Sequence, residues 1–162
     1  MKKIGLIMGS DSDLPVVEKA VAVLKEFGVG YECHIYSAHR TPKEAAEFAL
    51  NARKKGFGAI IAFAGMAAHL AGALAANTTL PVIAVPCKGG ALDGLDALLS
   101  SVQMPTGIPV ATVALGGGAN AALLAIEMLS IEDGTLARKL HQKRTKDGNA
   151  VLKKDAEIAS QL

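Results

Sequence analysis

A histidine and an arginine stand next to each other in the segment Ser37-Ala38-His39-Arg40-Thr41-Pro42. Thr41 and Pro42 are typical of a helix start, and the dipole at a helix N-terminus disfavours cationic side chains. Arg40 offers a planar fork to a phosphate or a carboxylate, and the imidazole of His39 can exchange protons near neutral pH. The pair therefore predicts a site that binds an anion and moves a proton. Alternatively, the histidine is simply exposed and the arginine solvated, and neither has a function.

A second polar segment, Gly9-Ser10-Asp11-Ser12-Asp13, follows the first apolar run of the chain. Backbone N–H groups and serine hydroxyls at a helix start can hold a phosphate. Asp13 is expected to cap the helix that begins with Leu14 and Pro15. Because a carboxylate repels a phosphate, we expect Asp13 to face ribose hydroxyls instead. Alternatively, this segment only forms a turn and caps the helix, without binding a ligand. Neither GxGxxG nor a Walker A motif is present to favour ligand binding.

His69 lies in the stretch 56–87, which contains no Asp, Glu, Lys or Arg. A lone histidine among apolar residues is more often a packed core residue than a ligand. His34 lies inside a predicted strand, and no HxxxH or HExxH pair points to a metal site. Cys87 has no evident catalytic partner, so we interpret it as a packed thiol. Cys33 and Cys87 match no zinc or CxxC spacing, which favours reduced thiols in a cytoplasmic protein.

Strand and helix patterns alternate along the chain, and they position these segments. We expect strands over residues 3–8, 31–36, 59–63, 81–85 and 110–115, and helices over 14–27, 41–54, 67–76, 92–102 and 119–129. In the second helix, Glu44 is expected to close a capping box with Thr41. The alternation predicts an α/β fold with a five-stranded parallel sheet between helix layers. Ligands bind at the carboxyl ends of such strands, which is where the polar segments fall.

Composition limits the classes of function. The chain has 162 residues, the size of one domain, and a formal net charge of +2. This charge balance gives no reason to expect a nucleic-acid partner. The stretch 59–76 is nearly all apolar, but Gly65, His69 and Gly72 interrupt it. A buried strand and a buried helix therefore explain it better than a membrane span does.

The C-terminal segment differs from the rest of the chain. It is rich in Lys and Arg, and its weak helical periodicity is expected to break near Gly148. We interpret it as a solvated terminal helix rather than a nucleic-acid-binding element. The predicted division is a catalytic domain over 1–133 and a helical tail over 134–162 that packs on a neighbouring element or subunit.

Five segments, in this order, resemble those of the N5-carboxyaminoimidazole ribonucleotide mutases, the bacterial catalytic-subunit family of class I phosphoribosylaminoimidazole carboxylase. They are residues 8–13 (MGSDSD), 37–42 (SAHRTP), 67–70 (AAHL), 102–110 (VQMPTGIPV) and 120–125 (NAALLA). The similarity runs from about residue 3 to residue 129. SAHRTP and QMPxGIPV are its most specific motifs. The resemblance implies a flavodoxin-like three-layer sandwich in a homo-octamer that uses no metal, nucleoside triphosphate or biotin.

The resemblance also assigns roles to residues. It implies that His39 is the catalytic acid–base and that the ribonucleotide is bound through the loops after the first two strands. Gly65 and His69 would line the pocket for the base and the carboxylate. The chain departs from the family where Met66 replaces a usual Gly and Ala71 a usual Pro, and Met66 either narrows the pocket or turns outward. The predicted substrate-binding residues are Ser10, Ser12, Asp13, Ser37, Arg40, Gly65, His69 and Leu70.

The implied reaction is an isomerisation of purine biosynthesis, in which carbon dioxide is lost from a nitrogen and recaptured by a ring carbon. A close alternative is direct carboxylation of aminoimidazole ribonucleotide by free carbon dioxide. The animal-type branch that does this typically has Lys after the SAH segment, so Arg40 favours the mutase. A non-catalytic nucleotide-binding or flavin-binding module is compatible with the fold but does not need His39.

The expected partners are a small-molecule substrate and other copies of the chain, with no nucleic acid and no membrane. The apolar, Ala-rich helix 67–76 offers few polar residues for solvent, which favours burial in a subunit interface. The resemblance leaves open a functional coupling to the ATP-dependent carboxylating enzyme of the same pathway.

Overall fold

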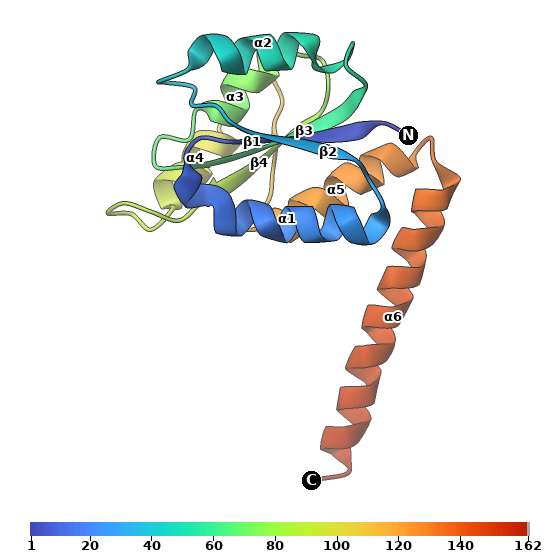
Figure 1. The fold of residues 1–162 in the computed structure, drawn as a ribbon. Helices are drawn as coiled ribbons and strands as arrows, with labels where there is room; N and C mark the ends of the chain where they lie inside the picture. The colour runs from blue at the N-terminus through green and yellow to red at the C-terminus, as the bar shows by residue number, and fades with distance from the viewer. Residues whose placement is uncertain (162) are drawn as a thin grey trace.

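The computed structural model describes residues 1–161 and contains one parallel sheet of five strands (Figure 1). The strands are β1 (Lys3–Met8), β2 (Tyr31–Ile35), β3 (Phe57–Gly65), β4 (Val82–Cys87) and β5 (Ala111–Thr112). Their order across the sheet is β2-β1-β3-β4-β5, and every neighbouring pair is parallel. This arrangement is flavodoxin-like, and it confirms the predicted fold class.

Helices cover both faces of the sheet. They are α1 (Leu14–Phe27), α2 (Pro42–Ala52), α3 (Leu70–Ala75), α4 (Leu95–Val102), α5 (Gly118–Ser130) and α6 (Gly134–Ala159), with a short 3₁₀ turn, η1 (Asp11–Asp13), before α1. Figure 1 shows α1 and α5 on one face and α2 and α3 on the other. The chain is therefore a three-layer sandwich, as the alternating pattern predicts.

The strand residues alternate between two hydrophobic cores because successive side chains point to opposite faces of a sheet. Ile4 and Leu6 pack on the α1 and α5 side, whereas Ile7 packs on the α2 and α3 side. Gly5 has a steric role on that second side. A Cβ at this position would lie 2.8 Å from the ring of Phe48, so the missing side chain lets α2 lie close to the sheet.

Three predicted boundaries at the carboxyl edge of the sheet are wrong. α3 begins at Leu70, so His69 is its N-cap residue and not part of its first turn. α4 begins at Leu95, because Asp93 and Gly94 have positive φ angles that a right-handed helix excludes. β5 is only two residues long, because only Ala111 and Thr112 pair with β4.

The predicted capping box of α2 is also wrong. Thr41 is the N-cap residue but makes no side-chain bond to the helix. Its hydroxyl instead accepts a hydrogen bond from the Ser37 N–H at 2.8 Å and donates to the Ser37 carbonyl at 3.2 Å. The threonine thereby stabilises the loop before the helix, and Glu44 has no partner at the cap.

The tail forms one continuous helix, α6, so the expected break near Gly148 is wrong. Ion pairs at i,i+4, such as Lys143 with Asp147, support the turn before the glycine. Leu136 and Leu140 are buried against α1 and α5, but the rest of α6 projects away from the sandwich (Figure 1). Within residues 1–161, no helix is both long and apolar enough to cross a membrane.

Candidate active site

A cavity of about 480 Å³ lies at the carboxyl ends of β1 to β4. It is formed by the loops that follow these four strands, as expected for an open parallel sheet. All the residues predicted to form the site line it, although their individual roles stay predictions. The lining residues are Gly9, Ser10, Ser12, Asp13, Ser37, Ala38, His39, Arg40, Ala64, Gly65, Met66, Ala67, His69, Leu70, Lys88 and Gly89.

Ser37 shapes the loop that carries His39 and Arg40. Its hydroxyl oxygen accepts hydrogen bonds from the backbone N–H groups of His39, at 3.3 Å, and Arg40, at 3.1 Å. Thr41 in turn holds the backbone of Ser37 from the start of α2. This compact turn fixes the backbone of the loop while both side chains stay exposed at the cavity.

His39 and His69 meet at the cavity, although 30 residues separate them in the sequence. The Nε2 atom of His39 lies 2.7 Å from the Nδ1 atom of His69, and the rings are arranged edge to face with centroids 4.9 Å apart. One ring donates its N–H to the lone pair of the other. His69 is exposed and lines the cavity, so the packed-core alternative for this histidine does not hold.

Metal-ligating side chains do not gather around this pair. Among residues 1–161, no group of three or more His, Cys, Asp or Glu side chains is arranged to hold a metal ion. The two rings contact each other directly, so each uses a nitrogen in this hydrogen bond. The arrangement suits proton exchange between two imidazoles.

Asp13 is the N-cap residue of α1, as predicted, but its side chain makes no hydrogen bond to that helix. The 3₁₀ turn η1 precedes the helix and has Ser10 as its own N-cap residue, and the Asp13 carboxylate accepts a hydrogen bond from the Ser10 N–H at 3.3 Å. Asp13 is buried in the floor of the site. Burial raises the pKa of its carboxyl group, while the contacts with Cys87 and the Ser10 N–H oppose the shift.

Cys87 lies beneath the cavity, at the end of β4. Its side chain is buried in the core on the α1 and α5 side. Burial, together with the nearby Asp13 carboxylate, raises the pKa of the thiol to about 12. The thiol is therefore protonated at neutral pH and is not a nucleophile, in agreement with its interpretation as a packed residue.

Met66 occupies a backbone position that favours glycine. Its φ angle is 54°, in the left-handed region, and its side chain is exposed rather than inserted into the core. A Cβ on Gly90 would lie 3.4 Å from the Cγ atom of Met66, so the methionine leans toward the loop after β4. Met66 also lines the cavity, so it is exposed at the pocket wall, and whether it narrows the pocket stays a prediction.

Lys88 and Gly89 belong to the cavity wall and were missed in the sequence analysis. Both follow β4 directly, so the rule that placed the other loops at the carboxyl edge could have found them. Lys88 belongs to no motif that would mark it as a functional residue rather than part of a flexible loop. The side chain forms an ion pair with Asp93 of the same loop, with Nζ 3.2 Å from Oδ2.

The strand order and the cavity at the carboxyl edge define a flavodoxin-like α/β domain with a pocket at the edge where such folds bind their ligands. The sequence profile of the family described as AIR carboxylase matches residues 3–150. The chain therefore belongs to the AIR carboxylase family, and the predicted resemblance is confirmed.

Individual relatives support this membership. The chain is 58% identical over 144 residues to N5-carboxyaminoimidazole ribonucleotide mutase of Pyrococcus abyssi, covering 89% of this chain and 83% of the relative. It is 55% identical over 151 residues to phosphoribosylaminoimidazole carboxylase of Saccharomyces cerevisiae, covering 93% of this chain but 26% of the yeast protein. The crystal structure of Treponema denticola PurE matches with a TM-score of 0.85 at 29% identity, covering 95% of this chain and 96% of that one.

Proposed function

We propose that the chain is an isomerase that converts N5-carboxyaminoimidazole ribonucleotide to 4-carboxy-5-aminoimidazole ribonucleotide in purine biosynthesis. The observation that carries this proposal is the 2.7 Å contact between His39 and His69 in a cavity that Arg40 also lines. Groups that exchange a proton thus lie beside a group that binds an anion. The name of the Pyrococcus abyssi relative supports the same reaction.

The reaction needs one proton to be given and later taken back. Protonation of the substrate's exocyclic nitrogen breaks the bond to the carboxylate carbon and releases carbon dioxide. The ring carbon then attacks this carbon dioxide, and the resulting tetrahedral carbon loses its proton. His39 serves both steps, first as acid and then as base. Proton transfer of this kind contributes roughly 10²- to 10⁴-fold in rate.

The pair with His69 suits this double role. Because one imidazole donates its N–H to the other, the pair presents both a proton and a basic nitrogen. The apolar part of the wall, which includes Ala64 and Leu70, holds carbon dioxide next to the ring. Arg40 and Ser10 bind the phosphate, and Asp13 faces the ribose hydroxyls.

An ultraviolet assay with and without added bicarbonate tests the proposal. An enzyme that recaptures its own carbon dioxide turns over N5-carboxyaminoimidazole ribonucleotide at a rate that bicarbonate hardly changes. Direct carboxylation is the second candidate, because the yeast relative carries the name of a carboxylase. Turnover of aminoimidazole ribonucleotide that rises with dissolved carbon dioxide, without turnover of the N-carboxylated compound, would establish the carboxylase instead.

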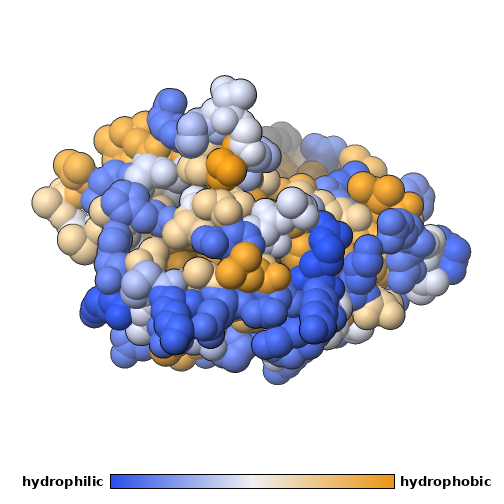
Figure 2. All heavy atoms as spheres, turned by 90° about the horizontal axis from the view of Figure 1, so that it is seen from above, coloured by the Kyte–Doolittle hydropathy of each residue, from blue (hydrophilic) through white to orange (hydrophobic). Residues whose placement is uncertain are grey.

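The proposed assembly is a homo-octamer in which the projecting part of α6 packs on a neighbouring subunit. Two exposed apolar surfaces support a subunit contact. One comprises Val151, Leu152 and Ile158 on α6, and the other includes Leu95 and Leu99 on α4. Figure 2 shows hydrophobic residues gathered at the end of the molecule where α4 lies. Light scattering during gel filtration should give the mass of an octamer, and a stable monomer would contradict it.

The apolar residues of α3 do not support a subunit contact, although the sequence suggested that they would. Leu70, Ala71, Leu74 and Ala75 are buried within the chain itself. The apolar character of α3 is thus explained by β3, β4 and α2, without a partner.

We propose that the reaction needs no metal or other cofactor and that it couples functionally to the ATP-dependent carboxylating enzyme that would supply its substrate. Dialysis against a strong chelator should leave the rate unchanged. A rate that falls and recovers on addition of a divalent metal would overturn the first point.

A further inference from the structure

Lys88 is a cation in the cavity wall that the proposed reaction has not used. It lies directly after β4, and its ammonium group is held by Asp93, six residues from the end of the strand, at 3.2 Å. Both side chains are mostly exposed, with 65% and 76% of their surfaces accessible. An exposed ion pair of this kind is weak, so a bound anion can replace Asp93 as the partner of Lys88.

The strand order determines which end of the cavity Lys88 occupies. Arg40 follows β2, and β1 and β3 lie between β2 and β4. Three strand spacings of about 4.8 Å therefore place the backbones after β2 and β4 about 14 Å apart. The two cations start from loops at opposite ends of one cavity, so a phosphate bound by the loops of Ser10 and Arg40 leaves Lys88 available for another negative group.

Lys88 instead lies at the end where the base is expected. In the sheet register, Gly65 pairs with Cys87, so Met66 and Lys88 are the first residues after two neighbouring strands. His69 follows Met66 by three residues and lines the same cavity. A ribonucleotide whose phosphate is bound near Ser10 and Arg40 directs its base, and any carboxylate on that base, toward His69 and Lys88.

We propose that Lys88 is a specificity-determining residue that binds the substrate's carboxylate after exchanging Asp93 for it. This inference rests on the proposed function. Both the N-carboxylated substrate and the C-carboxylated product carry this negative charge, whereas aminoimidazole ribonucleotide lacks it. Lys88 therefore favours carboxylated ribonucleotides over the uncarboxylated one. Since substrate and product are stabilised alike, the residue contributes to KM more than to kcat.

Calorimetric titration of two ligands into the full chain tests this role. Lys88→Gln should weaken binding of 4-carboxy-5-aminoimidazole ribonucleotide about tenfold, the scale of one hydrogen bond to a charged group. Its affinity for aminoimidazole ribonucleotide should change by less than about twofold, because that ligand carries no carboxylate for the lysine to bind. Lys88→Arg, which keeps the charge, should restore most of the preference. Asp93→Asn removes the competing carboxylate and should not weaken either ligand.

Lys2→Gln is the matched control. Lys2 forms an exposed pair with Glu132 at 3.1 Å, outside the cavity, so its loss should leave both affinities unchanged. Equal weakening of both ligands by Lys88→Gln would mean that the lysine binds the phosphate and would overturn the proposal. Unchanged affinity for both would overturn it as well. Failure of the unmodified chain to bind either ribonucleotide would instead reject the proposed function, and this inference with it.

Discussion

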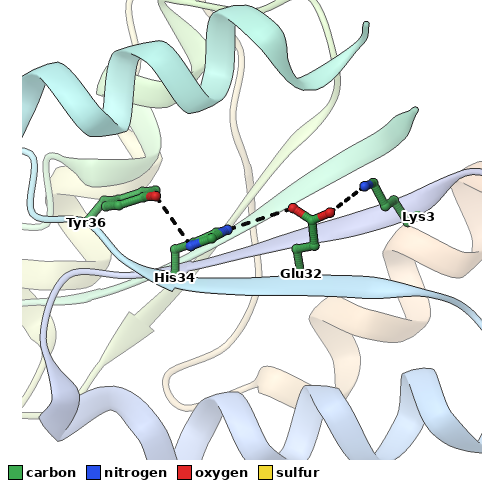
Figure 3. Close-up of polar contacts among 4 residues, drawn as sticks. All are labelled: Lys3, Glu32, His34 and Tyr36. Atoms are coloured by element: carbon green, nitrogen blue, oxygen red, sulfur yellow. Dashed lines mark hydrogen bonds and ion pairs between the residues drawn. The ribbon is translucent and has the colours of Figure 1, made fainter. Parts of the chain in front are cut away.

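Two histidines only five positions apart in the sequence have opposite environments. His34 on β2 lies in a row of polar groups that Figure 3 draws: its Nδ1 atom is 3.3 Å from the Tyr36 hydroxyl, and its Nε2 atom is 3.8 Å from Glu32. Its ring also stacks on Tyr36 at 5.0 Å, with an interplanar angle of 6°. Glu32 in turn contacts Lys3 at 2.5 Å.

His39, by contrast, contacts a second imidazole at the cavity. Both nitrogens of His34 face partners that hold its ring in place, the Tyr36 hydroxyl and the Glu32 carboxylate. The partner of His39 can itself gain or lose a proton. A histidine's role therefore depends on whether its partners can exchange protons, and neither residue type nor sequence position reveals this.

The largest effect should come from His39→Asn. Asparagine keeps hydrogen-bonding capacity but does not titrate, so kcat should fall at least about a hundredfold while the fold and ribonucleotide affinity are kept. Steady-state kinetics with binding measurements on the same preparation would show this. Near-normal turnover would transfer the proton-transfer role to His69 and reverse the assignment within the pair.

His69→Asn should have a smaller effect, about a tenfold loss of kcat, because His39 remains and only its partner changes. The sharper readout is the dependence of kcat on pH. Removal of the partner imidazole should shift this profile along the pH axis, whereas a purely steric role would lower the rate equally at every pH. A profile of unchanged shape would separate the two histidines functionally.

His34→Gln should change stability and not catalysis. Loss of the stacking on Tyr36 and of its ring contacts should lower the free energy of unfolding by about 1 kcal/mol, measured by urea denaturation. The value of kcat/KM should stay within about threefold. His141→Gln on the exposed surface of α6 is the control and should change neither. A large loss of kcat in His34→Gln would remove the distinction between the two histidine environments.

The smallest effect concerns Glu32 and pH. The hydrogen bond from Lys3 is the main reason that the pKa of the Glu32 carboxyl lies below its ordinary value of 4.5. A lowered pKa in the folded state stabilises the fold above the unfolded pKa, and this contribution is lost as pH falls through the folded pKa. Because the side chain is 43% exposed, Glu32→Gln should cost less than about 1 kcal/mol at pH 7.

This cost should disappear in acid. Unfolding free energies of the native chain and of Glu32→Gln, measured at pH 7 and again below the lowered pKa, should differ at the first pH and converge at the second. A difference that is the same at both would show that the carboxylate's charge contributes nothing.

The sequence predicted the layers and the location of the site well, because both depend on local signals. Alternating apolar patterns define β1 and α1, and polar residues after each strand define the carboxyl edge. The contact between His39 and His69 was not predicted, because it depends on how two loops meet and no local pattern encodes that. Similarly, the sequence did not predict the 3₁₀ turn before α1, in which the Asp13 carboxylate bonds to the Ser10 N–H and not to α1, and the continuity of α6 outweighed the helix-breaking tendency of Gly148.

The projecting helix α6 has a hydrodynamic consequence. Its 26 residues extend about 39 Å at 1.5 Å per residue, and most of that length lies outside the sandwich (Figure 1). A single chain of this shape experiences more friction than a sphere of equal mass, so it sediments and diffuses slowly for its size. Seating α6 on another copy would remove that excess drag. The frictional ratio, followed during dilution in the analytical ultracentrifuge, therefore reports directly on where this helix lies.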